Sequence, residues 1–240
     1  MNPTTKLLAA LLVLCVCAGT WADVPRLRVE CYTPGETPTP WYPQGVDNGD
    51  GTYTFSGTYS DPEYGDWTLN LQNVTVRSDP FINAVYGVTN NLGTTQNLIL
   101  SVSVPVSPTI TPSSLIGGST GGSINDANFD GVGTLATLGS GQPFYAGLID
   151  GVTVLPLYAD PFSVSVPFAG GTALIPALNA GLPGPTIPGP AVLSSIGIDH
   201  RFSLTAHDTA ALTSFFVAVP EPTTGALLAL GGLLLAARRH

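Results

Sequence analysis

The chain contains few of the residues that cross-link small exported domains or bind nucleic acid. Three of its 240 residues are cysteine, and charged residues make up 10%. Lys6 is the only lysine, so residues 23–221 contain none. That segment holds all sixteen acidic residues against four arginines, a formal net charge of −12. A surface of this sign repels nucleic acid and excludes nucleic-acid-binding classes, while it suits divalent cations or solubility in a polymer matrix.

The N-terminus has the pattern of a secretory signal peptide. Lys6 precedes an apolar run over residues 7–18, and Thr20-Trp21-Ala22 places small residues at the −3 and −1 positions of a signal-peptidase site. We predict that residues 1–22 are removed by cleavage after Ala22, with Ala18 as the second choice. The export translocase and signal peptidase are therefore predicted partners.

Signal-peptide cleavage leaves Cys31 as the single cysteine of the exported protein. One cysteine forms no intramolecular disulfide, so an apolar core must hold the fold. Two interpretations stay open for Cys31: a small buried apolar side chain, or an intermolecular disulfide.

The last 22 residues, 219–240, combine three features in a fixed order. Val219-Pro220-Glu221-Pro222 comes first, then an uncharged run rich in Leu, Ala and Gly, then Arg238-Arg239-His240. As a helix, the fifteen residues 223–237 would be about 22 Å long, short of the roughly 30 Å hydrocarbon core, which favours a transient anchor. The two arginines would stay cytoplasmic. The prolines keep the preceding segment extended and accessible to a protease.

These three features resemble the PEP-CTERM sorting signal of Gram-negative and related bacteria. By that resemblance the box is Pro220, Glu221 and Pro222, the transmembrane helix runs over about 224–237, and the basic end is Arg238 and Arg239. The resemblance implies processing by an exosortase and delivery to the cell surface or an exopolysaccharide matrix. The alternative is an ordinary C-terminal membrane anchor. The same tail is also called an ice-binding protein C-terminal domain, a label that says nothing about ice binding here.

Between the two signals, residues 23–218 are predicted to form one all-β extracellular domain. Apolar and polar residues alternate in seven segments, and clusters of Gly, Asn and Asp separate them. We therefore predict a β-sandwich of jelly-roll or immunoglobulin-like type, with an up-and-down barrel as the alternative. Residues 33–43 are expected to be an extended lead-in, 116–123 a flexible Gly/Ser loop, and 180–190 no central strand, because prolines remove ladder donors. The alternating segments are 52–56, 67–76, 81–89, 98–106, 162–166, 202–206 and 212–219.

The clearest metal-binding pattern is Asp-Ala-Asn-Phe-Asp-Gly at residues 126–131. Oxygen side chains at positions one, three and five, with Gly at six, make up the first half of an EF-hand-type calcium loop. Thr137 stands where the twelfth-position carboxylate belongs. The interpretations are a turn between strands or a weak Ca²⁺ site, and no other cofactor is predicted. The calcium ligands would be Asp126, Asn128, Asp130 and the carbonyl of Val132. A second oxygen-rich segment, 47–51, is predicted to be a hairpin turn.

Aromatic side chains are concentrated between residues 41 and 67, where Trp41 and Trp67 could form a carbohydrate platform or belong to the core. Asp61, Glu63 and Asp66 lie in the same region. A glycosidase needs two carboxylates about 5–10 Å apart, but a polar loop between strands also explains these acids.

Two histidine–aspartate pairs, at 199–200 and 207–208, are predicted not to form one metal site. Residues seven apart on a strand face opposite sides and lie roughly 23 Å apart. The sequence therefore predicts an exported cell-surface or extracellular-matrix protein with a structural or interaction role and no catalysis. A carbohydrate-binding module is the alternative, and a secreted hydrolase is the third possibility.

Overall fold

The computed structural model describes residues 24–77 and 80–221. The predicted signal peptide with Ala22, and the tail from Pro222 through the predicted helix to Arg238 and Arg239, lie outside these residues. Within the described ranges no helix has the length and apolarity needed to cross a membrane.

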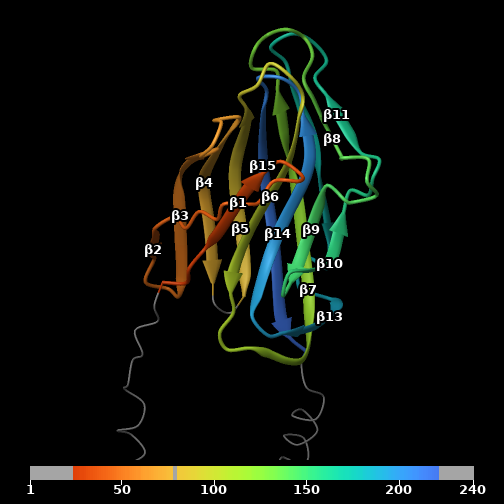
Figure 1. Ribbon diagram of the computed structural model, residues 1–240. Helices are drawn as coiled ribbons and strands as arrows, with labels where there is room; N and C mark the ends of the chain where they lie inside the picture. Colours follow the sequence, from red (N-terminus) through yellow and green to blue (C-terminus); the bar gives the residue numbers. More distant parts are fainter. Residues whose placement is uncertain (1–23, 78–79, 222–240) are drawn as a thin grey trace, which may run out of the picture.

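The described chain forms β-strands connected by turns and loops (Figure 1). Their bounds are β1 Arg28–Tyr32, β2 Gly45–Asp47, β3 Thr52–Ser60, β4 Trp67–Arg77, β5 Phe81–Asn90, β6 Gln96–Pro105, β7 Ile110–Asn125, β8 Thr134–Ala136, β9 Tyr145–Ile149, β10 Val152–Leu157, β11 Ser163–Ser165, β12 Thr172–Ala180, β13 Ile187–Val192, β14 Ser195–Leu204 and β15 Thr209–Pro220.

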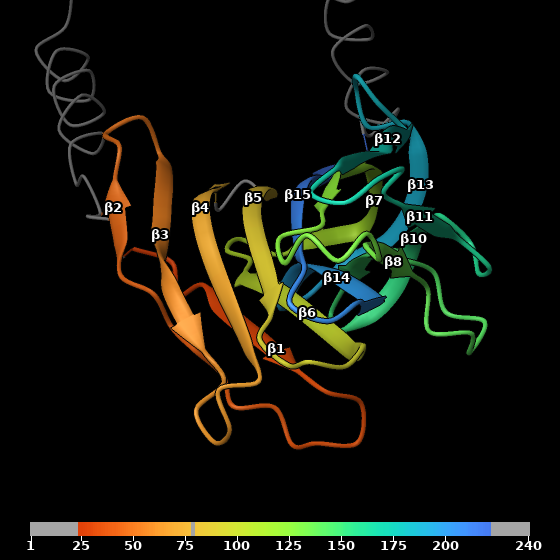
Figure 2. The same cartoon turned by 90° about the horizontal axis from the view of Figure 1, so that it is seen from above.

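The strands make two antiparallel sheets that face each other (Figure 2). In sheet A the order is β1-β6-β14, and the far edge of β14 pairs with both β9 and β8, which pair in turn with β10 and β11. In sheet B the order is β2-β3-β4-β5-β15-β7, and β7 pairs with both β12 and β13. The all-β, two-sheet prediction is confirmed, while its jelly-roll or immunoglobulin-like subtype stays a prediction.

The core lies between the sheets and follows the predicted alternation. On β6, Leu98, Leu100, Val102 and Val104 are buried, while Ser101 and Ser103 are partly exposed. Burying each such aliphatic side chain contributes roughly 1.5–3 kcal/mol. Alternating strands such as β4 and β15 bury the same face in the same way. Hydrophobic burial therefore fixes which face of each strand turns inward.

The prediction of a flexible loop over residues 116–123 is wrong. These residues lie inside β7, which runs next to β15 along the whole of that strand. Its glycines allow close approach of neighbouring groups. A Cβ on Gly122 would lie 2.1 Å from the carbonyl oxygen of Ala211, and one on Gly118 would lie 2.7 Å from the hydroxyl of Tyr145. The Gly/Ser composition therefore reflects tight packing against β15 and the core.

The proline-rich segment behaves as predicted. Pro188 and Pro190 lie in β13, which pairs with β7 and has no second neighbour among the described strands. An edge position leaves one side of the strand without a ladder, so the missing N–H groups of proline cost little there. The lead-in over residues 33–43 is also irregular, apart from an isolated bridge between Val29 and Trp41.

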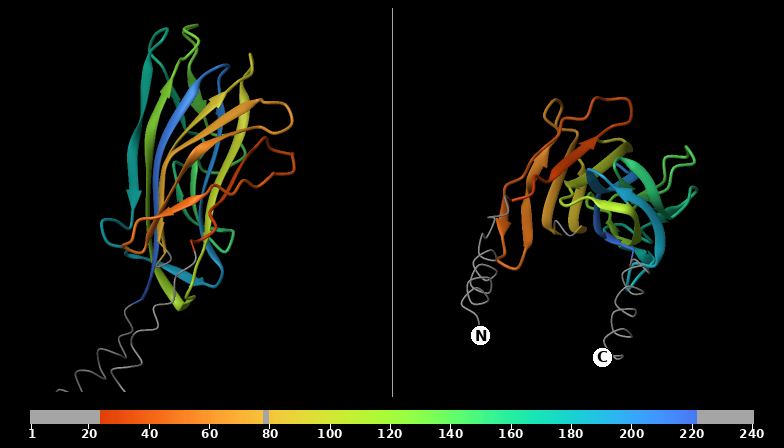
Figure 3. Two further views of the ribbon diagram at one scale, coloured as in Figure 1. Left: turned by 90° about the vertical axis from the view of Figure 1, so that its left-hand side faces the viewer. Right: turned by 90° about the horizontal axis from the view of Figure 1, so that it is seen from below.

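The two ends of the described chain lie at the same end of the sandwich. Val24 packs near Gly45 at the start of β2, and β15 ends at Pro220 (Figures 1 and 3). The loop that follows β7 and the turn between β14 and β15 lie at the opposite end (Figure 3).

Candidate functional site

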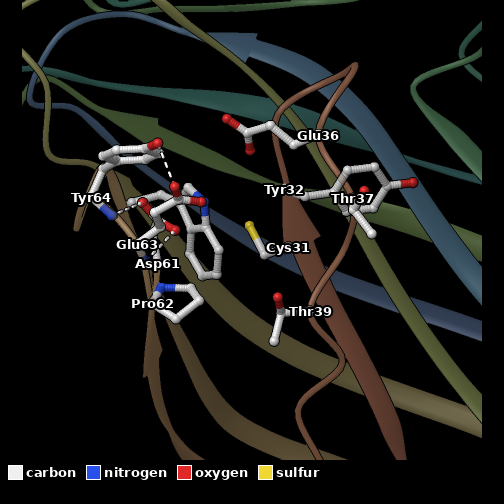
Figure 4. A pocket seen from close by; sticks show the side chains of 10 residues that line it. Cys31, Tyr32, Glu36, Thr37, Thr39, Asp61, Pro62, Glu63 and Tyr64 are labelled. Atoms are coloured by element: carbon white, nitrogen blue, oxygen red, sulfur yellow. Dashed lines mark hydrogen bonds between the residues drawn. The ribbon is translucent and has the colours of Figure 1, made fainter.

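A pocket of about 240 Å³ opens between the loop after β1 and the turn that joins β3 to β4 (Figure 4). The pocket therefore lies in the aromatic-rich region that the sequence singled out. Its lining combines aromatic rings, carboxylates and hydroxyls: Cys31, Tyr32, Glu36, Thr37, Thr39, Asp61, Pro62, Glu63, Tyr64 and Trp67.

Asp61 shapes one wall of the pocket. Its carboxylate accepts backbone N–H groups from Glu63 at 3.2 Å, Tyr64 at 2.9 Å and Asp66 at 3.2 Å. Burial alone would raise the pKa of Asp61, but these backbone hydrogen bonds outweigh it and lower the pKa. Asp61 is therefore ionised at neutral pH, and its oxygens hold the 61–66 turn in shape.

Tyr64 presents the most exposed ring of the pocket, with 68% of its surface accessible. Its hydroxyl donates to Glu63 Oε1 at 2.5 Å, which fixes the ring beside the carboxylates (Figure 4). Trp67 is only 2% exposed. No sequence pattern distinguishes the exposed ring from the buried one, because exposure depends on the turn geometry that Asp61 imposes.

Trp41 does not line the pocket, but it supports the pocket wall. Its ring stacks on Tyr59 with centroids 5.3 Å apart, and Tyr59 meets Trp67 edge-on at 5.6 Å. The two tryptophans predicted as a carbohydrate platform are thus connected through Tyr59. Trp67 is buried and Trp41 is partly exposed, so both act mainly as packing residues.

The lining of the pocket is acidic. Glu36, Asp61 and Glu63 face it, and no arginine, lysine or histidine lines it. Burial, followed by the charges of Asp61 and Glu36, raises the pKa of nearby Asp66. The negative potential repels anions and favours ligands that donate hydrogen bonds or carry positive charge.

Cys31 is buried, and its thiol lies at the base of this pocket (Figure 4). Burial first, and then the charge of Asp61, raises the pKa of the thiol. The thiol is therefore protonated at neutral pH and weakly reactive. Of the two interpretations from the sequence, the buried apolar side chain fits this position.

The acids predicted for a hydrolase are only partly brought together. Asp61 and Glu63 line the pocket, whereas Asp66 does not. The oxygens of Asp61 already accept three backbone N–H groups. The trio therefore fits the structured polar loop that the sequence also allowed.

The predicted calcium loop connects β7 to β8 at the end of the sandwich away from Pro220 (Figure 3). Asp126 is fully buried, and its Oδ2 accepts N–H groups from Gly131 at 2.8 Å and Gly170 at 2.9 Å. Asn128 Oδ1 accepts the N–H of Asp130 at 3.1 Å. Asp130 Oδ1 in turn accepts the N–H of Val132 at 2.7 Å. Across the described ranges, no group of three or more His, Cys, Asp or Glu side chains could hold a metal ion.

The second oxygen-rich segment, 47–51, is the turn of the β2–β3 hairpin, as predicted. Asp47 accepts the N–H of Gly49 at 2.8 Å, and Asp50 accepts the N–H of Thr52 at 2.9 Å.

The two histidines occupy separate environments. His200 on β14 points into the core, whereas His207 lies in the turn before β15. The Tyr86 hydroxyl is hydrogen bonded to His200 Nδ1 at 2.5 Å. On the other side of the ring, Nε2 lies 3.1 Å from the Thr120 hydroxyl and 3.2 Å from the Ser214 hydroxyl. Burial lowers the pKa of His200 to about 3, so the ring is neutral.

Comparison with known proteins identifies no family. No protein-family model matches the chain, and no curated protein matches it. A solved structure with some similarity is the crystal structure of the K1 cleaved adhesin domain of Lys-gingipain from Porphyromonas gingivalis W83. It shares 12% identity over 72% of this chain and 92% of that chain, with a TM-score of 0.27. A score this low supports no conclusion about the function of this chain.

Proposed function

We propose that this chain is an exported cell-surface or matrix interaction protein that binds a saccharide in the pocket between β1 and the β3–β4 turn. The observation that carries the proposal is the combination of the exposed Tyr64 ring with the carboxylates of Glu36, Asp61 and Glu63 in one concave site.

The chemistry of the pocket suits a polyhydroxylated ligand. The apolar face of a sugar ring packs on an aromatic ring such as Tyr64, because the flat face supplies contact area at low entropic cost. Sugar hydroxyls donate hydrogen bonds to carboxylates, and the threonine hydroxyls donate or accept. The volume of about 240 Å³ is below the roughly 300–1,000 Å³ of sites for drug-sized ligands. The pocket is therefore expected to hold one sugar residue, neutral or amino-substituted, of a longer chain.

Glycan-array binding of the purified protein tests this proposal. Stacking on an exposed ring contributes about 1 kcal/mol, so Tyr64→Ala should weaken binding roughly fivefold to tenfold. Tyr42→Ala removes a tyrosine that is 39% exposed but does not line the pocket, so this control should bind normally. If no glycan binds, or if the two variants bind alike, the pocket is not a saccharide site.

Export and sorting form the second part of the proposal, supported by the sequence of the two ends. The box begins where the sandwich ends, because Pro220 is the last residue of β15. Glu221 Oε2 also accepts a hydrogen bond from the Ser113 hydroxyl at 2.8 Å. We propose that an exosortase processes this segment and releases the protein to the surface or to an exopolysaccharide matrix.

Intact mass and cell fractionation of the native protein, beside a Glu221→Ala variant, test the sorting proposal. A form that lacks the residues beyond the box, found outside the cell and lost in the variant, supports it. A full-length protein retained in the membrane would instead identify an ordinary anchor.

A hydrolase is the second candidate, favoured by one observation. The carboxyl groups of Asp61 and Glu63 both line the pocket, and a glycosidase needs two carboxyl groups that face one sugar site. Turnover of a bound glycan that disappears in Glu63→Gln, with binding retained, would establish this activity. Binding without turnover in the wild-type protein would exclude it for that glycan.

A further inference from the structure

Asp126 has one buried carboxylate oxygen without a hydrogen-bond partner. The residue is fully buried, and Oδ2 accepts the N–H groups of Gly131 and Gly170. Oδ1 is also buried, and it has no hydrogen-bond partner. Buried carboxylate oxygens are almost always hydrogen bonded or bound to a cation, so such an oxygen points to a missing partner.

The 126–132 loop folds around the carboxyl group of Asp126. Its Oδ2 reaches the N–H of Gly131, five residues later, so the chain must curl around the carboxyl group. Phe129 and Gly131 have φ angles of 63° and 83°, and these left-handed residues make the tight curl possible. Oxygen side chains of Asn128 and Asp130 and the carbonyl of Val132 belong to the same short loop.

Negative charge accumulates around this loop. Asp208, in the turn between β14 and β15, is fully buried, and its carboxylate accepts the N–H of Ala127 at 3.2 Å and the hydroxyl of Thr205. The ion pairs formed by the described residues are Arg28–Glu30 and Arg201–Asp199, so none of them neutralises the loop.

We propose that the 126–132 loop binds one calcium ion. The ligands are Asp126 Oδ1, the side-chain oxygens of Asn128 and Asp130, and the carbonyl of Val132, with water completing the shell. An all-oxygen set with two carboxylates suits Ca²⁺, which takes 6–8 oxygens, better than Mg²⁺ or a transition metal. With no twelfth-position carboxylate, the site belongs to the weak extracellular class, with a Kd on the order of 10⁻⁴–10⁻³ M. Asp208 lies behind the loop as a supporting residue.

Calorimetric titration and thermal unfolding of the purified protein with CaCl₂ test the site. Titration should give about one calcium per chain. At a concentration tenfold above Kd, the ratio of folded to unfolded protein should rise about elevenfold. For a domain of this size, that stabilisation corresponds to a rise in Tm of about 3–5 °C.

Variants separate this loop from non-specific effects of calcium. Asp126→Asn should abolish the shift in Tm, and Asp130→Asn, at an exposed position, should weaken binding at least about tenfold. Asp50→Asn is the matched control, because the Asp50 carboxylate caps the exposed β2–β3 turn and has no buried oxygen without a partner. This variant should retain the full calcium-induced shift in Tm. If Asp126→Asn does not fold, Asp130→Asn decides. An unchanged Tm in the wild-type protein, equal binding by Asp130→Asn, or loss of the shift in Asp50→Asn would overturn the proposal.

Discussion

His200 is expected to make the stability of the sandwich depend on pH well above the range in which carboxylates titrate. The ring is fully buried between the sheets, and both of its nitrogens are within hydrogen-bond distance of neutral hydroxyl groups. Burial lowers the pKa of His200 to about 3 from its ordinary value of 6.5. Tyr86 and Tyr145 face the same ring, and burial raises the pKa of each, so both stay neutral.

The magnitude follows from proton linkage. Between about pH 3 and pH 6.5 the unfolded chain carries a proton on His200 and the folded chain does not, so stability falls as the pH falls through 6.5. Between pH 7 and pH 5 this single residue lowers the free energy of unfolding by about 2 kcal/mol. The free energy of unfolding continues to fall until the pH reaches the folded-state pKa of His200, about 3.

Urea unfolding of the wild-type protein and of His200→Gln at pH 7, 6 and 5 measures this effect. Glutamine fills much of the same space and can bond to the Tyr86 hydroxyl, but it does not titrate. The variant should be less stable at pH 7, and the difference should shrink by about 2 kcal/mol at pH 5. Contributions from the carboxylates cancel in this difference. A difference that is constant between pH 7 and pH 5 would refute the burial of a neutral His200.

Three further outcomes follow from other parts of the fold. Asp150 accepts the backbone N–H groups of residues 193–195, and these bonds overcome partial burial and lower its pKa to about 2. Asp150→Ala should therefore lower the free energy of unfolding by about 1 kcal/mol at pH 7, after allowance for solvent screening. Thermal unfolding should show this loss of stability fading as the pH drops from 4 to 2. The thiol of Cys31 in the exported protein should react with a disulfide reagent only at the rate of unfolding, and fast labelling of the native protein would contradict its burial. Gly122→Ala should destabilise by about 2 kcal/mol or more in urea because its Cβ would meet a backbone carbonyl, whereas Gly184→Ala, in open space, should be neutral.

The fold class could be predicted because most strands have one buried and one exposed face. The alternation in β6 and β15 comes directly from that asymmetry. It fails for β9, where every residue is buried, so apolar residues occupy both faces and no period-two pattern arises. It fails for β7 for another reason: glycine is required where Ala211 and Tyr145 approach, and glycine is read as a loop residue.

The candidate site was predicted in region but not in detail. The density of aromatic and acidic residues between 41 and 67 marks one of the two segments that line the pocket. The aromatic rings of this region differ in burial, because Trp67 packs in the core and Tyr64 is exposed. The 33–39 loop contributes Glu36 from across the pocket, and no local pattern connects it to the 61–66 turn. Only the antiparallel arrangement of distant strands brings these segments together.

The central position of β15 has a mechanical consequence. This strand is hydrogen bonded to β5 over residues 209–217 and to β7 over residues 209–220, and it ends where the described chain ends. A protein tethered by its C-terminus would receive any pulling force along the axis of β15. That force would load the ladders on both sides of the strand in shear, so many hydrogen bonds would resist together instead of opening one at a time. Such a shear geometry would keep the domain folded under tension applied at that end.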